Sequence, residues 1–319
     1  MGYTLEENER LSDSVKRMSV EKIDLALNNL SSVSDDLNES VHATRQSLKR
    51  LRALVALARG ELGAEVCERE WTCYRSAGRL LARARDAAAV VETLESLLNR
   101  FSNELPAGAF AAERRYLEER RDAQLERMVE GEALQQAFET LSSARERVAG
   151  WPVKRRGFKA LRDGVRDSYR TGREGLRSVV RHPTPTNFHE WRRPVKLLWH
   201  QLQILTLIWP PVLSAHAEEL HTLSDRLNEN HDLDVFRHAA LWSKFEAQPD
   251  ERQALVSLVE RRSRELEAEA LPLGERLYAE EPTRFMDRFE NYWRAWKRVH
   301  KHRAKVPVSS DRIAVAAGR

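Results

Sequence analysis

The chain of 319 residues is long enough for one large domain or two small ones, and its 41% hydrophobic and 32% charged residues exclude a disordered protein. The net charge of +4 identifies no partner by itself, because the distribution of the charges matters more. Two cysteines, Cys67 and Cys73, are too few for a disulfide framework. The polar, acidic N-terminus and the lack of a long apolar run predict a cytoplasmic protein without a membrane segment.

Apolar residues recur at spacings of three and four along almost the whole chain, and strict alternation is nearly absent. This periodicity predicts an all-α protein. The predicted helices span residues 10–30, 36–60, 66–101 with a break near Ala84, 109–128, 131–149, 154–181, 187–209, 213–230, 232–246, 249–270 and 283–301. Residues 302–319 lack sustained periodicity, so we predict a flexible tail there.

One helical pattern occurs twice, at residues 41–52 and 188–199. In both copies an apolar residue precedes a His, an Arg follows the His at +3, and a Lys follows it at +7. Segments 81–86 and 227–232 align at nearly the same offset. We therefore predict a single domain, residues 10–301, that arose by internal duplication. Its halves, about 10–150 and 151–301, would form two four-helix bundles related by a pseudo-two-fold axis.

The repeated pattern places its basic residues on one face of each helix, because positions 0, +3, +7 and +10 align there. These residues are His42, Arg45, Lys49 and Arg52 in the first copy, with Arg50 alongside, and His189, Arg192 and Lys196 in the second, with Arg193 alongside. No acidic residue lies between Val41 and Arg59. Such like charges repel unless an anion or a partner's carboxylates neutralise them. The repetition favours an anion-binding face over a merely solvated one.

A second basic feature lies on the predicted helix 154–181. Basic residues recur there every three or four positions, as Arg155, Lys159, Arg162, Arg166, Arg170, Arg173, Arg177 and Arg181. This arginine row flanks the apolar stripe of the helix, so its charged ends should reach the edge of a groove. A row of this length suits a linear polyanion better than a single metabolite. The alternative is a helix that pairs with an acidic neighbour.

Chemistry other than anion binding has little support. The stretch from His189 to Arg193 has an Arg where a His-Glu-x-x-His zinc motif needs its second His, and Arg and Lys neighbours disfavour a divalent cation. No phosphate-binding Gly-rich loop, dinucleotide fingerprint or Gly-x-Ser-x-Gly motif is present. We therefore expect a non-enzymatic protein with no metal and no cofactor. Two alternatives stay open: a nucleic-acid-binding helical protein and a phosphate-chain hydrolase. The carboxylates nearest the motifs are Asp86, Asp225, Asp232 and Asp234; they could act as general bases, but we expect them to orient the Arg and His side chains through charge-assisted hydrogen bonds.

These motifs together resemble the CHAD family, the conserved histidine α-helical domain, over about residues 10–300. The resemblance rests on segments 41–52, 85–86, 169–173, 188–196 and 230–234, in that order. It implies two four-helix bundles related by pseudo-two-fold symmetry, binding of inorganic polyphosphate rather than a specific nucleic acid, and association with polyphosphate granules. The phosphate contacts that it implies are His42, Arg45, Lys49, Arg50, Arg52, Arg85, Arg166, Arg170, Arg173, His189, Arg192, Arg193 and Lys196.

The sequence departs from the family pattern at three positions. Ala88 stands where a second Asp often follows the Arg-Asp pair. Pro194 lies inside the second motif helix, where it should remove one backbone hydrogen bond and kink the helix. Trp199 takes the place of the Arg at +10. We therefore expect the second copy to contact phosphate less completely than the first.

Overall fold

The computed structural model describes residues 3–7, 9–31, 36–154, 157–242 and 249–303. Arg155 of the arginine row and residues 304–319 of the predicted tail lie outside the described residues. Within the described ranges the regular elements are helices, which confirms the all-α prediction. They are α1 Leu11–Ser31, α2 Leu37–Leu57, α3 Arg59–Leu80, α4 Ala82–Arg100, α5 Ala111–Glu130, α6 Ala133–Val148, α7 Lys159–Arg181, α8 Pro185–Leu205, the 3₁₀ turn η1 Thr206–Ile208, α9 Pro210–Trp242, α10 Pro249–Leu277 and α11 Pro282–Arg303.

The two helices that carry the repeated motif begin at side-chain caps. Asp36 accepts a hydrogen bond from the backbone N–H of Glu39 at 3.0 Å, and α2 begins directly after it. Thr184 caps α8 in the same way, through the N–H of Asn187 at 3.2 Å, and Pro185 occupies the first turn. Both caps satisfy N–H groups that a helix leaves unpaired at its start. They fix the register at which each motif faces its neighbours.

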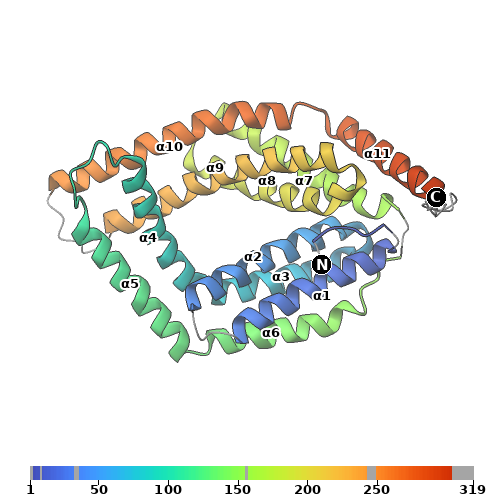
Figure 1. Ribbon diagram of the computed structural model, residues 1–319, viewed down its shortest axis with the longest axis horizontal. Coiled ribbons are helices and arrows are strands. Elements are labelled where there is room, and N and C mark those ends of the chain that lie inside the picture. Colours follow the sequence, from blue (N-terminus) through green and yellow to red (C-terminus); the bar gives the residue numbers. More distant parts are fainter. Residues whose placement is uncertain (1–2, 8, 32–35, 155–156, 243–248, 304–319) are drawn as a thin grey trace, which may run out of the picture.

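The helices form two groups that pack against each other (Figure 1). In the first group α1, α2, α3 and α6 contact one another around a shared core, and in the second α8 lies between α7 and α9, with α10 against both α7 and α9. Contacts of α2 with α8 and of α3 with α7 join the groups. Helices α4 and α5 extend to one side, where α4 packs on α9. The internal duplication behind these two groups stays a prediction.

Glycines allow the second group to close tightly. A Cβ at Gly164 would collide with the carbonyl oxygens of Ala56 and Leu57, so only glycine lets α7 cross directly over the end of α2. The Trp191 ring is fully buried. A Cβ at Gly175 or Gly274 would lie 2.7 or 2.5 Å from that ring. Trp191 therefore locks α8 between α7 and α10.

Several predicted helix boundaries were wrong. The break predicted between 230 and 232 is absent: α9 runs unbroken from Pro210 to Trp242, with no proline after its first turn and no glycine to interrupt it. Helix α2 ends at Leu57, and α3 already begins at Arg59 and continues through a kink at Gly63, where φ is 76°. Helix α8 runs unbroken through Pro194.

In the described part of the chain, no helix is both long enough and apolar enough to span a membrane.

Candidate functional site

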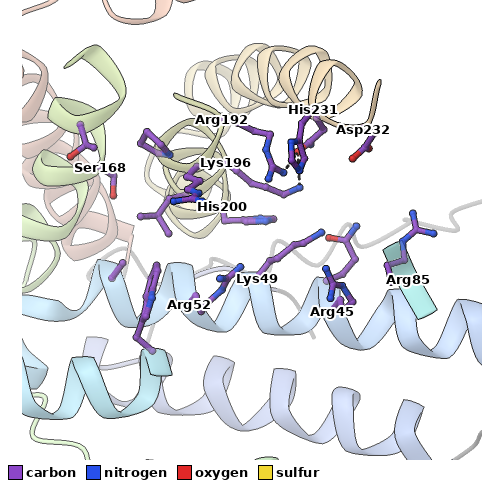
Figure 2. A pocket seen from close by; sticks show the side chains of 18 of the residues that line it. Arg45, Lys49, Arg52, Arg85, Ser168, Arg192, Lys196, His200, His231 and Asp232 are labelled. Atoms are coloured by element: carbon purple, nitrogen blue, oxygen red, sulfur yellow. Dashed lines mark hydrogen bonds between the residues drawn. The ribbon is translucent and has the colours of Figure 1, made fainter. Parts of the chain in front are cut away.

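A cavity of about 680 Å³ lies where the two groups of helices meet, and basic side chains dominate its walls. Eight Arg and Lys side chains line it against three Asp side chains. The basic ones are Arg45, Lys49, Arg52, Arg59, Arg85, Arg192, Arg193 and Lys196, and the acidic ones are Asp86, Asp167 and Asp232. Figure 2 shows the main basic residues of α2 on one wall and those of α8 on the facing wall. We call this space the central cavity.

The α2 wall presents Arg45, Lys49 and Arg52 in a row, as their helical spacing predicts. Two of these side chains are held in place. The Arg45 guanidinium donates a hydrogen bond to the carbonyl oxygen of Gly78 at 2.8 Å. The Arg52 guanidinium lies 5.5 Å from the centre of the Trp71 ring, within the range of a cation–π contact. The neighbouring helix α3 therefore orients the ends of the row.

The α8 wall is oriented by Asn228 of α9. Its Oδ1 accepts hydrogen bonds from Arg192 at 3.0 Å and from Lys196 at 3.4 Å, and its amide nitrogen donates to the Ser224 hydroxyl at 3.3 Å. The amide is thereby fixed with its oxygen toward the two cations. The Nε of Arg192 is buried and has no hydrogen-bond partner among the described residues. Asn228 therefore aligns the cations without neutralising them.

The cations of the central cavity divide into a paired and an unpaired set. Four of them form a salt bridge each: Arg45, Arg59, Arg85 and Arg193. The closest pairs are Arg85 with Glu92 at 2.5 Å and Arg59 with Asp167 at 2.8 Å. The other four, Lys49, Arg52, Arg192 and Lys196, form no salt bridge with any described residue. Unpaired, half-buried charges of one sign are unfavourable unless an anion joins them.

The electrostatics of the two lysines reflect this imbalance. Burial, followed by repulsion from Lys196 and Arg45, lowers the pKa of Lys49 to about 6. Burial and repulsion from Arg192 lower the pKa of Lys196 to about 8. Burial raises the pKa of the Asp232 carboxyl, although Arg192 opposes this shift. The site thus holds too little negative charge for its own cations.

Two histidines form a pair beside the cavity. The Nδ1 atoms of His189 and His231 lie 2.9 Å apart, and Arg193 donates to the Nε2 of His189 at 2.9 Å. Because Arg can only donate, a neutral His189 carries its proton on Nδ1 and donates it to His231. Burial lowers the pKa of His189, and it lowers that of His231 to about 4. Both rings are therefore neutral near pH 7, and His231 is the one that lines the cavity.

The structure brings eight of the thirteen predicted contacts together at the central cavity. These are His42, Arg45, Lys49, Arg52, Arg85, Arg192, Arg193 and Lys196. It places the other five, Arg50, Arg166, Arg170, Arg173 and His189, outside the cavity lining. The Arg50 guanidinium lies 5.8 Å from the Tyr3 ring. His189 lines a separate pocket with Phe188 and Asp234.

The arginine row does not reach the cavity, because carboxylates engage much of it. Arg166 pairs with Asp163 at 3.2 Å on its own helix, and Arg173 pairs with Glu281 at 2.6 Å beyond the end of α10. Helix α7 instead lines the cavity with small and acidic residues, among them Gly164, Asp167 and Ser168. The arrangement agrees with the alternative that the sequence left open, a basic helix paired with acidic neighbours.

Several residues that line the cavity were missing from the predicted contacts, among them Trp71, Asn228, His231 and Asp232. The last three lie in or beside segment 227–232, which aligns with 81–86 in the repeat. That alignment was the signal that could have found them. Trp71 carried no signal, since a lone Trp on a helix is more often a core residue.

Comparison with known proteins decides the family. A family model described as the CHAD domain matches residues 21–241, more than half of the chain. The chain belongs to the CHAD domain family. Both motif helices of this CHAD domain, α2 and α8, border the central cavity.

Two solved structures share the fold. The CHAD domain from the plant Ricinus communis is similar with a TM-score of 0.64 and 17% identity, covering 88% of this chain and 95% of that one. PptA from Streptomyces chartreusis is similar with a TM-score of 0.59 and 18% identity, covering 85% of this chain and 100% of that one. At such identities the likeness concerns the fold. No curated protein matches the sequence.

Proposed function

We propose that this CHAD domain binds inorganic polyphosphate in the central cavity and does so without catalysis. The observation that carries the proposal is the convergence of Lys49, Arg52, Arg192 and Lys196, from two facing helices, without a carboxylate partner among the described residues. Phosphate oxygens accept charge-assisted hydrogen bonds from both side-chain types, and guanidinium groups match them with two parallel donors. A bound polyanion would replace repulsion between these cations by attraction.

The shape of the site supports a chain of phosphates over a single one. Arg45, Lys49 and Arg52 follow one another along α2, and Arg192 and Lys196 face them from α8 (Figure 2). A linear polyanion carries its charges in a row and can meet both walls at once. The family resemblance supports the same ligand, and we propose that such binding brings the protein to polyphosphate granules in the cytoplasm.

Nucleic acid fits the cavity less well. Proteins that bind single strands without sequence preference stack bases on aromatic side chains. Trp71 is the single Trp, Tyr or Phe lining the cavity among the described residues, and Arg52 covers it. Competition discriminates the two ligands: RNA should displace polyphosphate poorly if the cavity recognises phosphates alone.

A hydrolase is the second alternative. Asp86, Asp167 and Asp232 line the cavity, but no group of three or more His, Cys, Asp or Glu side chains in the described ranges could hold a metal ion. Incubation with polyphosphate and magnesium tests this alternative directly. Phosphate release that depends on Asp232 would replace binding by catalysis as the proposed function.

Calorimetric titration with long-chain polyphosphate at low salt tests the proposal. The test variant is Lys49→Gln with Arg192→Gln, which removes one unpaired cation from each wall. The control is Arg115→Gln with Arg127→Gln, two exposed arginines of α5 outside the cavity. We expect the test variant to bind about a hundredfold more weakly, at about tenfold for each contact, and the control to bind like wild type. Absence of wild-type binding, or equal affinity of the test variant, would contradict the proposal.

A further inference from the structure

A second, smaller cavity lies against the same face of α2. It measures about 200 Å³ and lies between α2, α3 and the start of α4. Arg45, Lys49 and Arg52 line it from α2, and Arg75 and Arg79 line it from α3. No carboxylate is among its lining residues in the described part of the chain. We call it the α3 pocket.

The α3 pocket adjoins the central cavity. Arg45, Lys49 and Arg52 line both spaces, so the basic row of α2 is their common wall. The hydrogen bond from Arg45 to the carbonyl of Gly78 holds one guanidinium at this boundary. A ligand that contacts these three side chains in the central cavity is therefore already at the entrance of the α3 pocket.

Arg75 and Arg79 lack the partners that other arginines of the same helix have. Arg69 pairs with Glu70 at 3.0 Å, whereas the side chains of Arg75 and Arg79 are exposed and form no salt bridge or hydrogen bond with a described residue. Lying four residues apart, they share one face of α3. Burial lowers the pKa of Arg52, and repulsion from Arg45 and Arg75 lowers it further. The like charges of Arg52 on α2 and Arg75 on α3 thus repel each other.

We propose that a polyphosphate chain held in the central cavity continues over α2 into the α3 pocket, where Arg75 and Arg79 bind its next phosphates. This inference rests on the proposed function and adds a second subsite to it. The ligand class is a linear polyanion longer than the central cavity holds. A short phosphate chain fills the central cavity alone and leaves the α3 pocket empty.

The test compares two ligands on one variant. Wild type and the double variant Arg75→Gln with Arg79→Gln are titrated with tripolyphosphate and with long-chain polyphosphate at several salt concentrations. We expect tripolyphosphate affinity to be unchanged and long-chain affinity to fall about tenfold, or about 1.4 kcal/mol. The slope of log affinity against log salt should become shallower by about 1.4, at about 0.7 for each lost contact with a single-stranded polyanion. The variant Arg115→Gln with Arg127→Gln controls for net charge.

The outcomes separate this inference from the function beneath it. Unchanged long-chain affinity and salt slope overturn the α3 subsite, and so does an equal loss for both ligands, since that places Arg75 and Arg79 at the central cavity. In either case the binding by wild type stands. If wild type binds neither ligand while circular dichroism shows it folded, the proposed function itself fails.

Discussion

Lys49 of α2 and Lys196 of α8 reach toward each other across the central cavity (Figure 2). Two ammonium groups that face each other repel, and burial removes the water that would screen them. Burial, followed by this repulsion, lowers the pKa of Lys49 to about 6, and burial lowers the pKa of Lys196 to about 8. The pair is a place where a bound anion changes the protonation of the protein.

Polyphosphate affinity should accordingly fall as the pH rises. Above about pH 6 the Lys49 amine of the unliganded protein is neutral, and a bound polyanion favours its charged form, so binding takes up a proton. One linked proton weakens binding by up to about tenfold for each pH unit. Titrations in two buffers of different ionisation enthalpy measure the proton uptake.

The variant Lys49→Arg serves as the control for this linkage. A guanidinium stays charged throughout the range, so the variant should lose the part of the pH dependence that Lys49 contributes. Among the facing groups, burial lowers the pKa of His42, and it lowers the pKa of His231 to about 4. Identical pH profiles for wild type and variant would exclude Lys49 as the linked group.

Replacing Lys49 by Met should stabilise the unliganded protein and weaken binding. Lys49 has a pKa of about 6 in the folded protein against an ordinary value of 10.5, so folding releases a proton and the contribution of Lys49 to stability rises with pH. Met has no amine to bury and deprotonate, so it removes the free-energy cost that the lowered pKa of Lys49 represents. We expect the free energy of unfolding to increase by about 1 kcal/mol near neutral pH. Urea denaturation at two pH values measures it.

The pH dependence of the urea denaturation checks that the amine of Lys49 causes the difference in stability. The advantage of Lys49→Met should shrink as the pH rises, because wild type then approaches the neutral amine in both states. Polyphosphate should raise the melting temperature of the variant less than that of wild type. A variant that is less stable at every pH would show that Lys49 has compensating contacts.

The sequence predicted the fold class and the α2 wall because both follow from local spacing. Periodicity of three to four residues defines helices, and a His, Arg and Lys at 0, +3 and +7 must share a face. The α7 row was misplaced for a different reason: residues that flank an apolar stripe can face either of two neighbours. Only the folded chain shows that Glu281 and Asp287 lie beside Arg173 and Arg162.

The repeat alignment included Asn228 in segment 227–232, but it could not give the partners of the Asn228 side chain. Its hydrogen bonds to Arg192 and Lys196 connect residues that are far apart in the chain, and local spacing does not show that the two helices meet there.

Single substitutions can distinguish the contribution of the arginine row on α7 to polyphosphate binding from that of the basic residues on α2. Arg170 lies outside the central cavity and pairs with Asp167 at 3.6 Å and Glu174 at 3.8 Å on its own helix. Arg170→Gln should leave polyphosphate affinity near the wild-type value, whereas Arg52→Gln should lower it about tenfold. Calorimetry at one salt concentration compares them. An equal loss in both variants would return the α7 row to the binding surface.

The sharpest test of the unpaired cations adds a carboxylate where the structure holds an amide. Asn228→Asp keeps the shape of the side chain and places a negative charge 3.0 Å from Arg192 and 3.4 Å from Lys196. The new carboxylate should stabilise the unliganded protein and compete with phosphate, so we expect about tenfold weaker polyphosphate binding. Asn99→Asp, at an exposed position of α4, adds the same charge outside the cavity and should change neither quantity. Unchanged or tighter polyphosphate binding by Asn228→Asp would show that Arg192 and Lys196 do not contact the ligand.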